Sequence, residues 1–313
     1  MLDRALPESH KPSSHSNGDD FQMGKNIHRY HKDDLDKNKK PEGSFTVLMS
    51  VYAREKPEAL EEAFTSIVAS TRLPSELVLV KDGFLPKNLE RVIEKYKIGD
   101  KLKLVVVGYE ENKGLATALS FGLKFVKTEL VARMDSDDVC AEDRFEKQLR
   151  FMEENPDIAV SSGYIEEFLD KPGVTVSVRR VPLTSEAVHE RLKSRCPFNH
   201  MAVMYRKSAV LAAGSYQVVP FFEDYDLWFR MDAMGFKGAN LPDTLVYARI
   251  GNDMIGRRHG LSYAKSELNF LRRQREKGFL SATEYAKTLL LRVPGRLLPK
   301  AVLAVVYKGV RKL

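Results

Sequence analysis

The sequence predicts an α/β fold in which helices flank a mixed, mainly parallel sheet. From residue 45 onward, short apolar runs alternate with amphipathic stretches, and a polar residue follows each of the first apolar runs. Such alternation is typical of parallel strands joined by crossover helices, which places helices on both faces of the sheet. The expected strands are 45–51, 77–81, 102–107 and 130–134, and the helices between them are 57–70, 86–96 and 114–127.

Later elements are less regular. A helix is expected over 142–154, with Phe145, Leu149 and Met152 facing inward and Asn155-Pro156 ending it. Strand-like runs follow at 158–169 and 200–205, and a helix at 224–234 ends at Gly235. The C-terminal stretch reads as amphipathic helices broken by Pro294 and Pro299.

The composition is that of a globular protein with a sizeable apolar core. The chain has 313 residues with 43% apolar content, enough for a sizeable core. Its two cysteines, Cys140 and Cys196, lack metal-type spacing, so we expect no disulfide framework and a cytoplasmic location. Neither a signal peptide nor an apolar run of about 18 to 20 residues is visible, so we expect no membrane span.

Three regions are expected. Residues 1–44 form a polar, disordered tail, 45–256 a catalytic domain and 257–313 a basic set of amphipathic helices. The net charge is +7, and seven cations but no acid follow Glu284. Because these cations are interleaved with leucines, an anionic membrane surface on the cytoplasmic side is a more suitable partner than nucleic acid. A solvated terminal helix packed on its own domain is an open alternative.

Polar side chains follow the ends of the first strands. Ser50, Asp82, Asn112 and Asp135 all lie at or just beyond a predicted strand end. In open α/β sheets, ligands bind in the crevice outside the carboxyl ends of the strands. We therefore expect these four residues to share one crevice.

Three carboxylates, Asp135, Asp137 and Asp138, gather after the fourth strand. A calcium loop of EF-hand type is excluded because Cys140 stands where that loop needs glycine. Helix capping explains one carboxylate, so a metal site for a nucleoside diphosphate is favoured. Arg133 precedes the cluster in a strand expected to be buried, so it should pair with an acid of the site.

Several motifs in order resemble those of family 2 glycosyltransferases. They are Ser50-Val51-Tyr52, Leu79-Val80-Lys81-Asp82-Gly83, Asn112-Lys113-Gly114-Leu115 with Ala118-Leu119-Ser120-Phe121-Gly122, and Met134-Asp135-Ser136-Asp137-Asp138. The resemblance covers about residues 45–250 and is closest to the kind involved in bacterial polysaccharides such as amylovoran. It implies a GT-A fold, Rossmann-like in its nucleotide-sugar binding, and a hexosyltransferase that inverts configuration.

The resemblance also implies roles for single residues. Ser50 and Tyr52 would neighbour the nucleotide of a sugar donor, expected to be UDP-linked. Asn112 and Arg133 are also expected along the donor. Arg257 follows Gly256 in a loop, where its guanidinium suits a diphosphate, and a solvated basic turn is the open alternative. Asp82 would contact the base. Asp135 would contact the ribose or a metal, and Asp137 would bind Mn²⁺ or Mg²⁺.

A second acidic pair lies at Glu223-Asp224. The resemblance makes Asp224 the general base of a single displacement and Glu223 a group that orients the site. The alternative is helix capping, in which the helix dipole would lower the pKa. His200 would line the acceptor pocket or fill a polar core position, and Trp228 is expected in the core.

The expected function is transfer of a sugar from a nucleotide sugar to a saccharide acceptor, lipid-linked at the cytoplasmic membrane face. A sugar-nucleotide nucleotidyltransferase is an alternative, although the segment 53–57 lacks the glycine of a phosphate loop. A catalytically silent protein of the same fold is another. A dinucleotide oxidoreductase is excluded because no G-x-G-x-x-G follows a strand.

Overall fold

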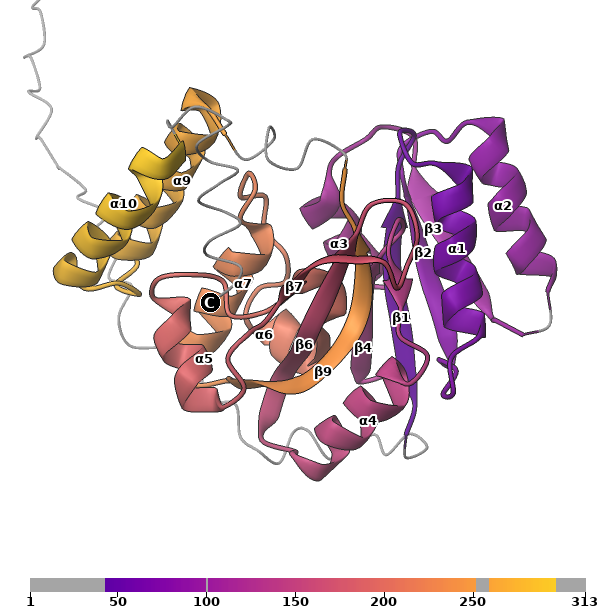
Figure 1. Ribbon diagram of the computed structural model, residues 1–313, viewed down its shortest axis with the longest axis horizontal. Coiled ribbons are helices and arrows are strands. Elements are labelled where there is room, and N and C mark those ends of the chain that lie inside the picture. The colour runs from indigo at the N-terminus through magenta and orange to yellow at the C-terminus, as the bar shows by residue number, and fades with distance from the viewer. Residues whose placement is uncertain (1–42, 100, 252–258, 297–313) are drawn as a thin grey trace, which may run out of the picture. The chain divides into compact units, whose positions relative to one another are not determined.

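A computed structural model describes residues 43–99, 101–251 and 259–296 (Figure 1). Its first half confirms the predicted alternation. The elements are β1 (Phe45–Val51), α1 (Pro57–Val68), β2 (Glu76–Asp82), α2 (Lys87–Ile98), β3 (Leu104–Tyr109), α3 (Leu115–Gly122) and β4 (Leu130–Asp135). Helix α3 ends earlier than predicted.

The second half is more varied. It contains β5 (Val139–Cys140), α4 (Arg144–Glu154), β6 (Ile158–Phe168), β7 (Thr175–Arg179), α5 (Ser185–Leu192), a 3₁₀ turn η2 (His200–Ala202), β8 (Met204–Arg206), α6 (Lys207–Ala212), α7 (Glu223–Ala233), β9 (Lys237–Arg249), α9 (Leu261–Glu276) and α10 (Ala282–Arg296). The predicted strand 200–205 is wrong in its first half, which is the turn η2. Pro294 lies inside α10, so it does not break that helix where predicted, and Pro299 lies outside the described residues.

The strands form one mixed sheet in the order β3-β2-β1-β4-β8-β6-β9-β5, with β7 paired to β6. The pairings of β1 with β2, β1 with β4 and β2 with β3 are parallel. The chain therefore leaves β1 toward one side of the sheet and returns on its other side at β4. Such a reversal of strand order opens the crevice in which α/β sheets bind ligands.

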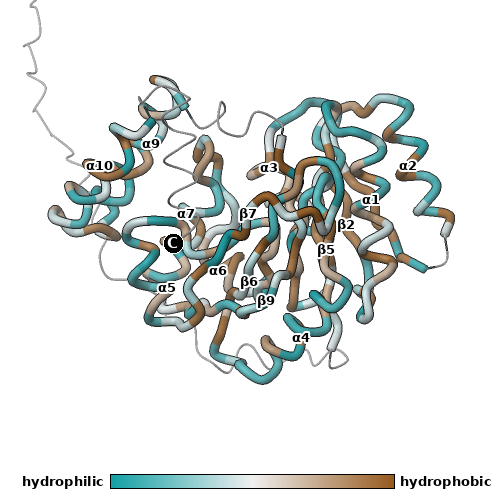
Figure 2. Tube along the Cα trace, viewed as in Figure 1, coloured by the Kyte–Doolittle hydropathy of each residue, from teal (hydrophilic) through white to brown (hydrophobic). Residues whose placement is uncertain are grey.

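Alternating side chains of the parallel strands form two apolar layers. Val47 and Met49 pack with α1, α2 and α4, whereas Leu48 and Val80 pack on the other face with α3. Figure 2 shows hydrophobic residues along these strands. Helices thus cover both faces, as predicted, and Phe145, Leu149 and Met152 of α4 are buried.

The helices α9 and α10 pack on each other and on α7. Buried Glu267 of α9 forms ion pairs with Arg292 (2.5 Å) and Arg296 (2.7 Å) of α10. Buried Asp226 of α7 accepts hydrogen bonds from Arg230 (2.8 Å) and from Gln274 of α9 (3.1 Å). Charged side chains inside the packing therefore join α10 to α9 and α9 to α7.

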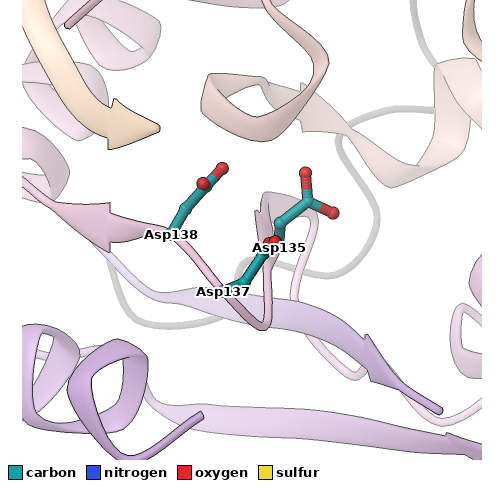
Figure 3. A group of neighbouring side chains, drawn as sticks. All are labelled: Asp135, Asp137 and Asp138. Carbon is teal, nitrogen blue, oxygen red and sulfur yellow. The ribbon is translucent and has the colours of Figure 1, made fainter. Parts of the chain in front are cut away.

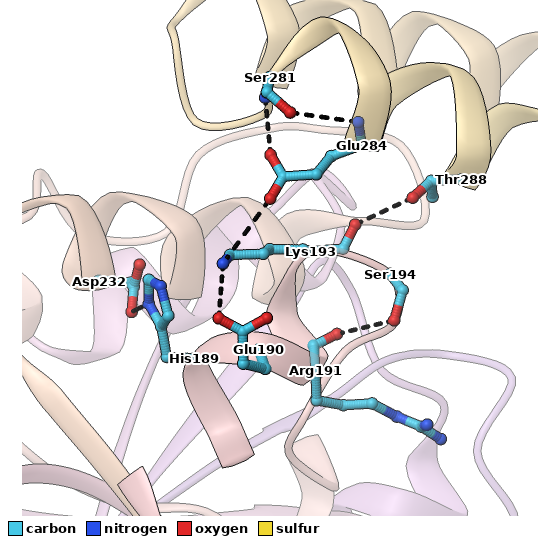
Figure 4. Close-up of polar contacts among 9 residues, drawn as sticks. All are labelled: His189, Glu190, Arg191, Lys193, Ser194, Asp232, Ser281, Glu284 and Thr288. Atoms are coloured by element: carbon cyan, nitrogen blue, oxygen red, sulfur yellow. Dashed lines mark hydrogen bonds and ion pairs between the residues drawn. The ribbon is translucent and has the colours of Figure 1, made fainter. Parts of the chain in front are cut away.

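Polar contacts also join α10 to the end of α5 (Figure 4). Ser281 and Glu284 form a capping box at the start of α10, since each side chain accepts the other's backbone N–H. Glu284 also pairs with Lys193 at 3.7 Å, and Thr288 Oγ1 donates to the Lys193 carbonyl at 3.0 Å. No helix among the described residues is both long and apolar enough for a membrane span.

Candidate active site

The three carboxylates after β4 converge. Asp135 ends the strand, Asp137 lies in the following turn and Asp138 directly precedes β5 (Figure 3). One oxygen from each lies within 4.8 Å of the others. Neither Asp137 nor Asp138 caps α4, whose N-cap is Asp143, so capping does not explain the cluster.

Arg133 pairs with the cluster as predicted. Its guanidinium, with only 2% of the side chain exposed, donates to both oxygens of Asp135 at 2.8 and 2.5 Å. Arg144 Nη2 donates to the Arg133 carbonyl at 2.7 Å and braces the strand. Asp138 accepts the backbone N–H of Arg249 at 2.8 Å, which ties the cluster to the end of β9.

The cluster carries more negative charge than Arg133 neutralises. Burial, followed by the charges of Asp135 and Glu55, raises the pKa of Asp137 to about 7. Burial, followed by the charges of Asp135 and Asp137, raises the pKa of Asp138 well above its ordinary value. Ser136 Oγ donates to Glu55 at 2.6 Å, which brings this fourth acid close. Clustered carboxylate oxygens with unbalanced charge fit a hard divalent cation such as Mn²⁺ or Mg²⁺.

Asp82 holds the loop between β3 and α3. Its carboxylate accepts hydrogen bonds from Tyr109 Oη (2.8 Å), Asn112 Nδ2 (3.0 Å) and the backbone N–H groups of Lys113 (2.8 Å) and Gly114 (3.0 Å). A carboxylate has about four lone-pair sites, so a base could bind Asp82 only by displacing one of these donors. The predicted contact with the base stays a prediction.

Glycine explains how closely this loop approaches β2. Gly83 has φ +90°, and a Cβ there would lie 2.7 Å from the backbone nitrogen of Asn112. The Asp-Gly and Asn-Lys-Gly motifs are thus two halves of one contact.

The other predicted donor residues lie at the same edge. Ser50 is in register with Asp135 on β4 and with Val80 on β2. Tyr52 follows β1 and is 40% exposed. Arg257 lies outside the described residues.

The second acidic pair opens α7. Glu223 and Asp224 are its first two residues, and neither caps the helix. Burial, followed by the charge of Asp224, raises the pKa of Glu223 to about 7. Burial also raises the pKa of Asp224, although a hydrogen bond from the backbone N–H of Tyr225 and the charges of Arg133 and Arg179 oppose this. Cys196 Sγ lies 3.6 Å from Asp224 Oδ2. In both residues the effect of burial therefore outweighs the hydrogen bonds from backbone N–H groups at the start of the helix.

Arg133 relates the two acidic groups to each other. Arg133 pairs with Asp135. Its positive charge also favours a lower pKa for Asp224 and for His200. The negative charge of Asp135 in turn contributes to the raised pKa of Glu223. The carboxyl pair of α7 and the cluster after β4 therefore lie near enough for their charges to influence one another.

His200 is partly buried, and its Nε2 lies 3.0 Å from Tyr216 Oη. Burial, followed by the charge of Arg133, lowers the pKa of His200 well below its usual value and so favours the neutral ring. Trp228 is buried against Phe198 with ring centroids 5.3 Å apart, which confirms its place in the core.

Sequence reasoning missed several residues of the site. Tyr109 ends β3 at the same edge as Asp82, and its position after an apolar run could have revealed it. Glu55, Arg249 and Cys196 reach the site through pairings between distant segments, for which the sequence carries no local signal.

Comparison with solved structures identifies the fold. The mannosyltransferase PcManGT from Pyrobaculum calidifontis, solved with GDP-Man and Mn²⁺, is similar with a TM-score of 0.55 and 16% identity, over 88% of this chain and 85% of that one. This likeness confirms the predicted GT-A fold of nucleotide-sugar glycosyltransferases.

The family follows from sequence comparison. The model of glycosyl transferase family 2 matches residues 46–211. The amylovoran biosynthesis glycosyltransferase AmsE of Erwinia amylovora is 40% identical, over 86% of this chain and 99% of the relative. The UDP-Gal:alpha-D-GlcNAc-diphosphoundecaprenol beta-1,3-galactosyltransferase of Escherichia coli is 34% identical, over 85% and 96%. The chain belongs to glycosyltransferase family 2, and the protein is a glycosyltransferase.

Proposed function

We propose that the protein transfers a sugar, with inversion, from a nucleoside diphosphate sugar to an acceptor hydroxyl in bacterial surface polysaccharide synthesis. The observation that carries this proposal is the carboxylate cluster after β4, which the buried Arg133 binds through Asp135; the charge of Arg133 also favours the ionised form of Asp224. We infer that one site holds oxygen ligands for a donor diphosphate and a carboxylate for the acceptor. A direct displacement needs both, on opposite faces of the sugar.

Asp137 and Asp138 would hold the metal, with Asp135 beside them. Asp135 already accepts two hydrogen bonds from Arg133, so it is better placed to orient the cluster than to be its main ligand. When bound, a divalent cation supplies positive charge to the departing diphosphate. The raised pKa of Asp137 supports this assignment, because a nearby cation would relieve the repulsion.

Asp224 would accept the proton of the attacking hydroxyl. Its raised pKa makes it a stronger base than an ordinary aspartate. Glu223 and the neutral His200 would orient the acceptor, while Ser50, Tyr52 and Asn112 would line the donor.

The names of two relatives support one choice of donor and acceptor for this protein. One is named for UDP-galactose and a diphosphoundecaprenol-linked acceptor, and another for amylovoran biosynthesis. We propose a UDP-linked donor and a lipid diphosphate-linked sugar as acceptor.

Transfer is tested with purified full-length protein, UDP-galactose, Mn²⁺ and N-acetylglucosamine diphosphate esterified to an undecyl chain. We expect a disaccharide product with a β linkage, seen by NMR as inversion of the α donor, and its loss with EDTA. A panel of other UDP-sugars replaces UDP-galactose in parallel. An α-linked product would contradict direct displacement, release of pyrophosphate from UTP and a sugar phosphate would indicate the nucleotidyltransferase alternative, and no turnover of any donor would favour a silent protein.

The outer surface of α10 supports binding to an anionic membrane. Arg292 and Arg296 turn inward to Glu267, with side chains 17% and 14% exposed. Leu290 and Leu291 are instead 70% and 68% exposed. The described part of α10 therefore offers leucines outward, together with the exposed Lys287, as interfacial helices do.

Replacing Leu290 and Leu291 together with glutamate is expected to lower binding to vesicles containing phosphatidylglycerol by at least about tenfold. Each buried leucine contributes about 1.5–3 kcal/mol, and the new charges are repelled by the lipid. Co-sedimentation measures the effect. Leu211→Glu, at a half-exposed position on α6, is the matched control. Unchanged sedimentation of the double variant would assign α10 to the packed-helix alternative. Substitution is a cleaner test than deletion, which would leave Glu267 buried without its arginines.

A further inference from the structure

The turn that leads into α7 has an unusual residue at its tightest point. In Val219-Pro220-Phe221-Phe222, the N–H of Phe222 donates to the Val219 carbonyl at 2.9 Å. Phe221 has φ +68°, so the turn has proline at its second position and a left-handed residue at its third. This is the pattern of a type II turn, which strongly favours glycine where Phe221 stands.

A bulky side chain in the left-handed region strains the backbone. Among the described residues, Ser215 is the one other residue apart from glycines with positive φ. Burial does not offset the strain fully, because Phe221 is 52% exposed. Strained residues of this kind concentrate at functional sites, where the surrounding structure holds them in place.

The turn directs the rings of Phe221 and Phe222 to different neighbours. Phe222 points into the core and stacks on Phe270, with centroids 4.6 Å apart and planes 12° apart. Phe221 points outward and rests on Tyr263 at 4.9 Å. Arg296 lies over the Tyr263 ring at 4.8 Å. The exposed ring of Phe221 is therefore supported from behind by an ordered stack.

Phe221 lies close to the proposed base Asp224 along the chain. Asp224 follows three residues later, so their Cα atoms are at most about 11 Å apart. Ligand sites combine aromatic side chains with a few polar groups that fix orientation, and an exposed aromatic ring offers an apolar surface to the C–H face of a pyranose. A sugar resting on Phe221 could thus present a hydroxyl to Asp224.

We propose that Phe221 is the platform on which the sugar ring of the acceptor stacks, and that this contact selects a pyranose with an apolar face. The proposal rests on the proposed function of Asp224 as base. It assigns the exposed ring to the acceptor sugar, not to the lipid chain.

The test compares Phe221→Gly with Phe221→Tyr in the full-length protein, with UDP-galactose and N-acetylglucosamine diphosphate esters of short and long alkyl chains. Glycine suits the turn, so Phe221→Gly should melt at or above the wild-type Tm. We expect its acceptor KM to rise at least tenfold with both esters, while the donor KM stays within twofold. Phe221→Tyr should restore the acceptor KM. Ser215→Gly, the matched change at the other left-handed residue, should leave the acceptor KM within twofold.

Two results would overturn the proposal. An acceptor KM within twofold of wild type in Phe221→Gly would remove the ring from acceptor binding. A rise seen with the long-chain ester alone would show that Phe221 contacts lipid. Asp224→Asn serves as the parallel reference: if it is inactive while Phe221→Gly behaves as wild type, the platform is wrong and the proposed function stands. If Asp224→Asn keeps full activity, the proposed base itself is wrong.

Discussion

Replacing Asp224 with asparagine is expected to lower the rate of sugar transfer by roughly 10² to 10⁴-fold, the usual contribution of a positioned general base. The amide keeps the shape of the side chain but cannot take a proton at neutral pH. Donor affinity should stay within about twofold, because Asp224 lies on α7 and the proposed diphosphate ligands follow β4. Initial rates under saturating donor and acceptor measure the first quantity, and UDP titration with Mn²⁺ the second.

Asp232→Asn is the matched control for this change. Asp232 lies on the same helix and its carboxylate contacts His189 at 2.8 Å, at the surface. Transfer should remain within about twofold of wild type, since exposed pairs contribute little. Activity of Asp224→Asn within tenfold of wild type would remove Asp224 from the role of base.

The pH dependence of transfer follows from the same assignment. Burial raises the pKa of Asp224 and brings that of Glu223 to about 7, so the pair gains protons as the pH falls toward neutrality. Transfer should therefore decline as the pH falls, beginning near pH 7, where Glu223, proposed to orient the acceptor, takes up a proton. Carboxyl groups whose pKa is raised by folding stabilise the folded state most when protonated, and this contribution is lost as pH rises through the folded pKa. The decline in rate at lower pH is thus not unfolding caused by these groups, and Tm measured in parallel separates the two effects.

Some positions in the site could be predicted from the strand in which a residue lies and from the free-energy cost of burying its charge. Arg133 was expected to pair with an acid because a lone cation in a buried strand is costly, and it binds Asp135 through both oxygens. The shared edge of Ser50 and Asp135 followed from parallel strands, and β1 and β4 are paired in that register.

Other features depend on long-range pairing or on backbone geometry. Strand β9 carries Arg249 to Asp138, but its sequence alternates weakly and its partner β6 is distant along the chain. The left-handed φ of Phe221 cannot be read from composition, because turns of this type normally carry glycine. Arg292 of α10 turns toward the buried Glu267, which lies on another helix, so its orientation could not be read from the local pattern of cations and leucines.

Asp137→Asn is expected to abolish the metal-dependent binding of donor and, at the same time, to stabilise the protein without metal. The pKa of Asp137 is about 7 because burial and the charges of Asp135 and Glu55 oppose its ionisation. At pH 8 the folded state therefore holds an unfavourable negative charge, which the amide removes. If relief of this repulsion is worth about 1 kcal/mol, the Tm of the metal-free protein rises by about 2–4 °C. In wild type, Mn²⁺ with UDP should raise the Tm by binding the folded state, and the variant should lose most of this rise.

Differential scanning fluorimetry at pH 8, with EDTA or with Mn²⁺ and UDP, measures both effects in one experiment. Asp157→Asn is the matched control, because this exposed carboxylate pairs with Lys237 at the surface and lies outside the cluster. Its Tm should change little under either condition, and its response to Mn²⁺ with UDP should equal that of wild type. A full Mn²⁺ response in Asp137→Asn would show that the metal is held elsewhere. A lower metal-free Tm would show that Asp137 stabilises the fold, which is contrary to the repulsion that its surroundings imply. We expect Asp137→Asn to gain stability and to lose binding. These opposite effects are expected when a ligand site keeps charges together that destabilise the folded protein.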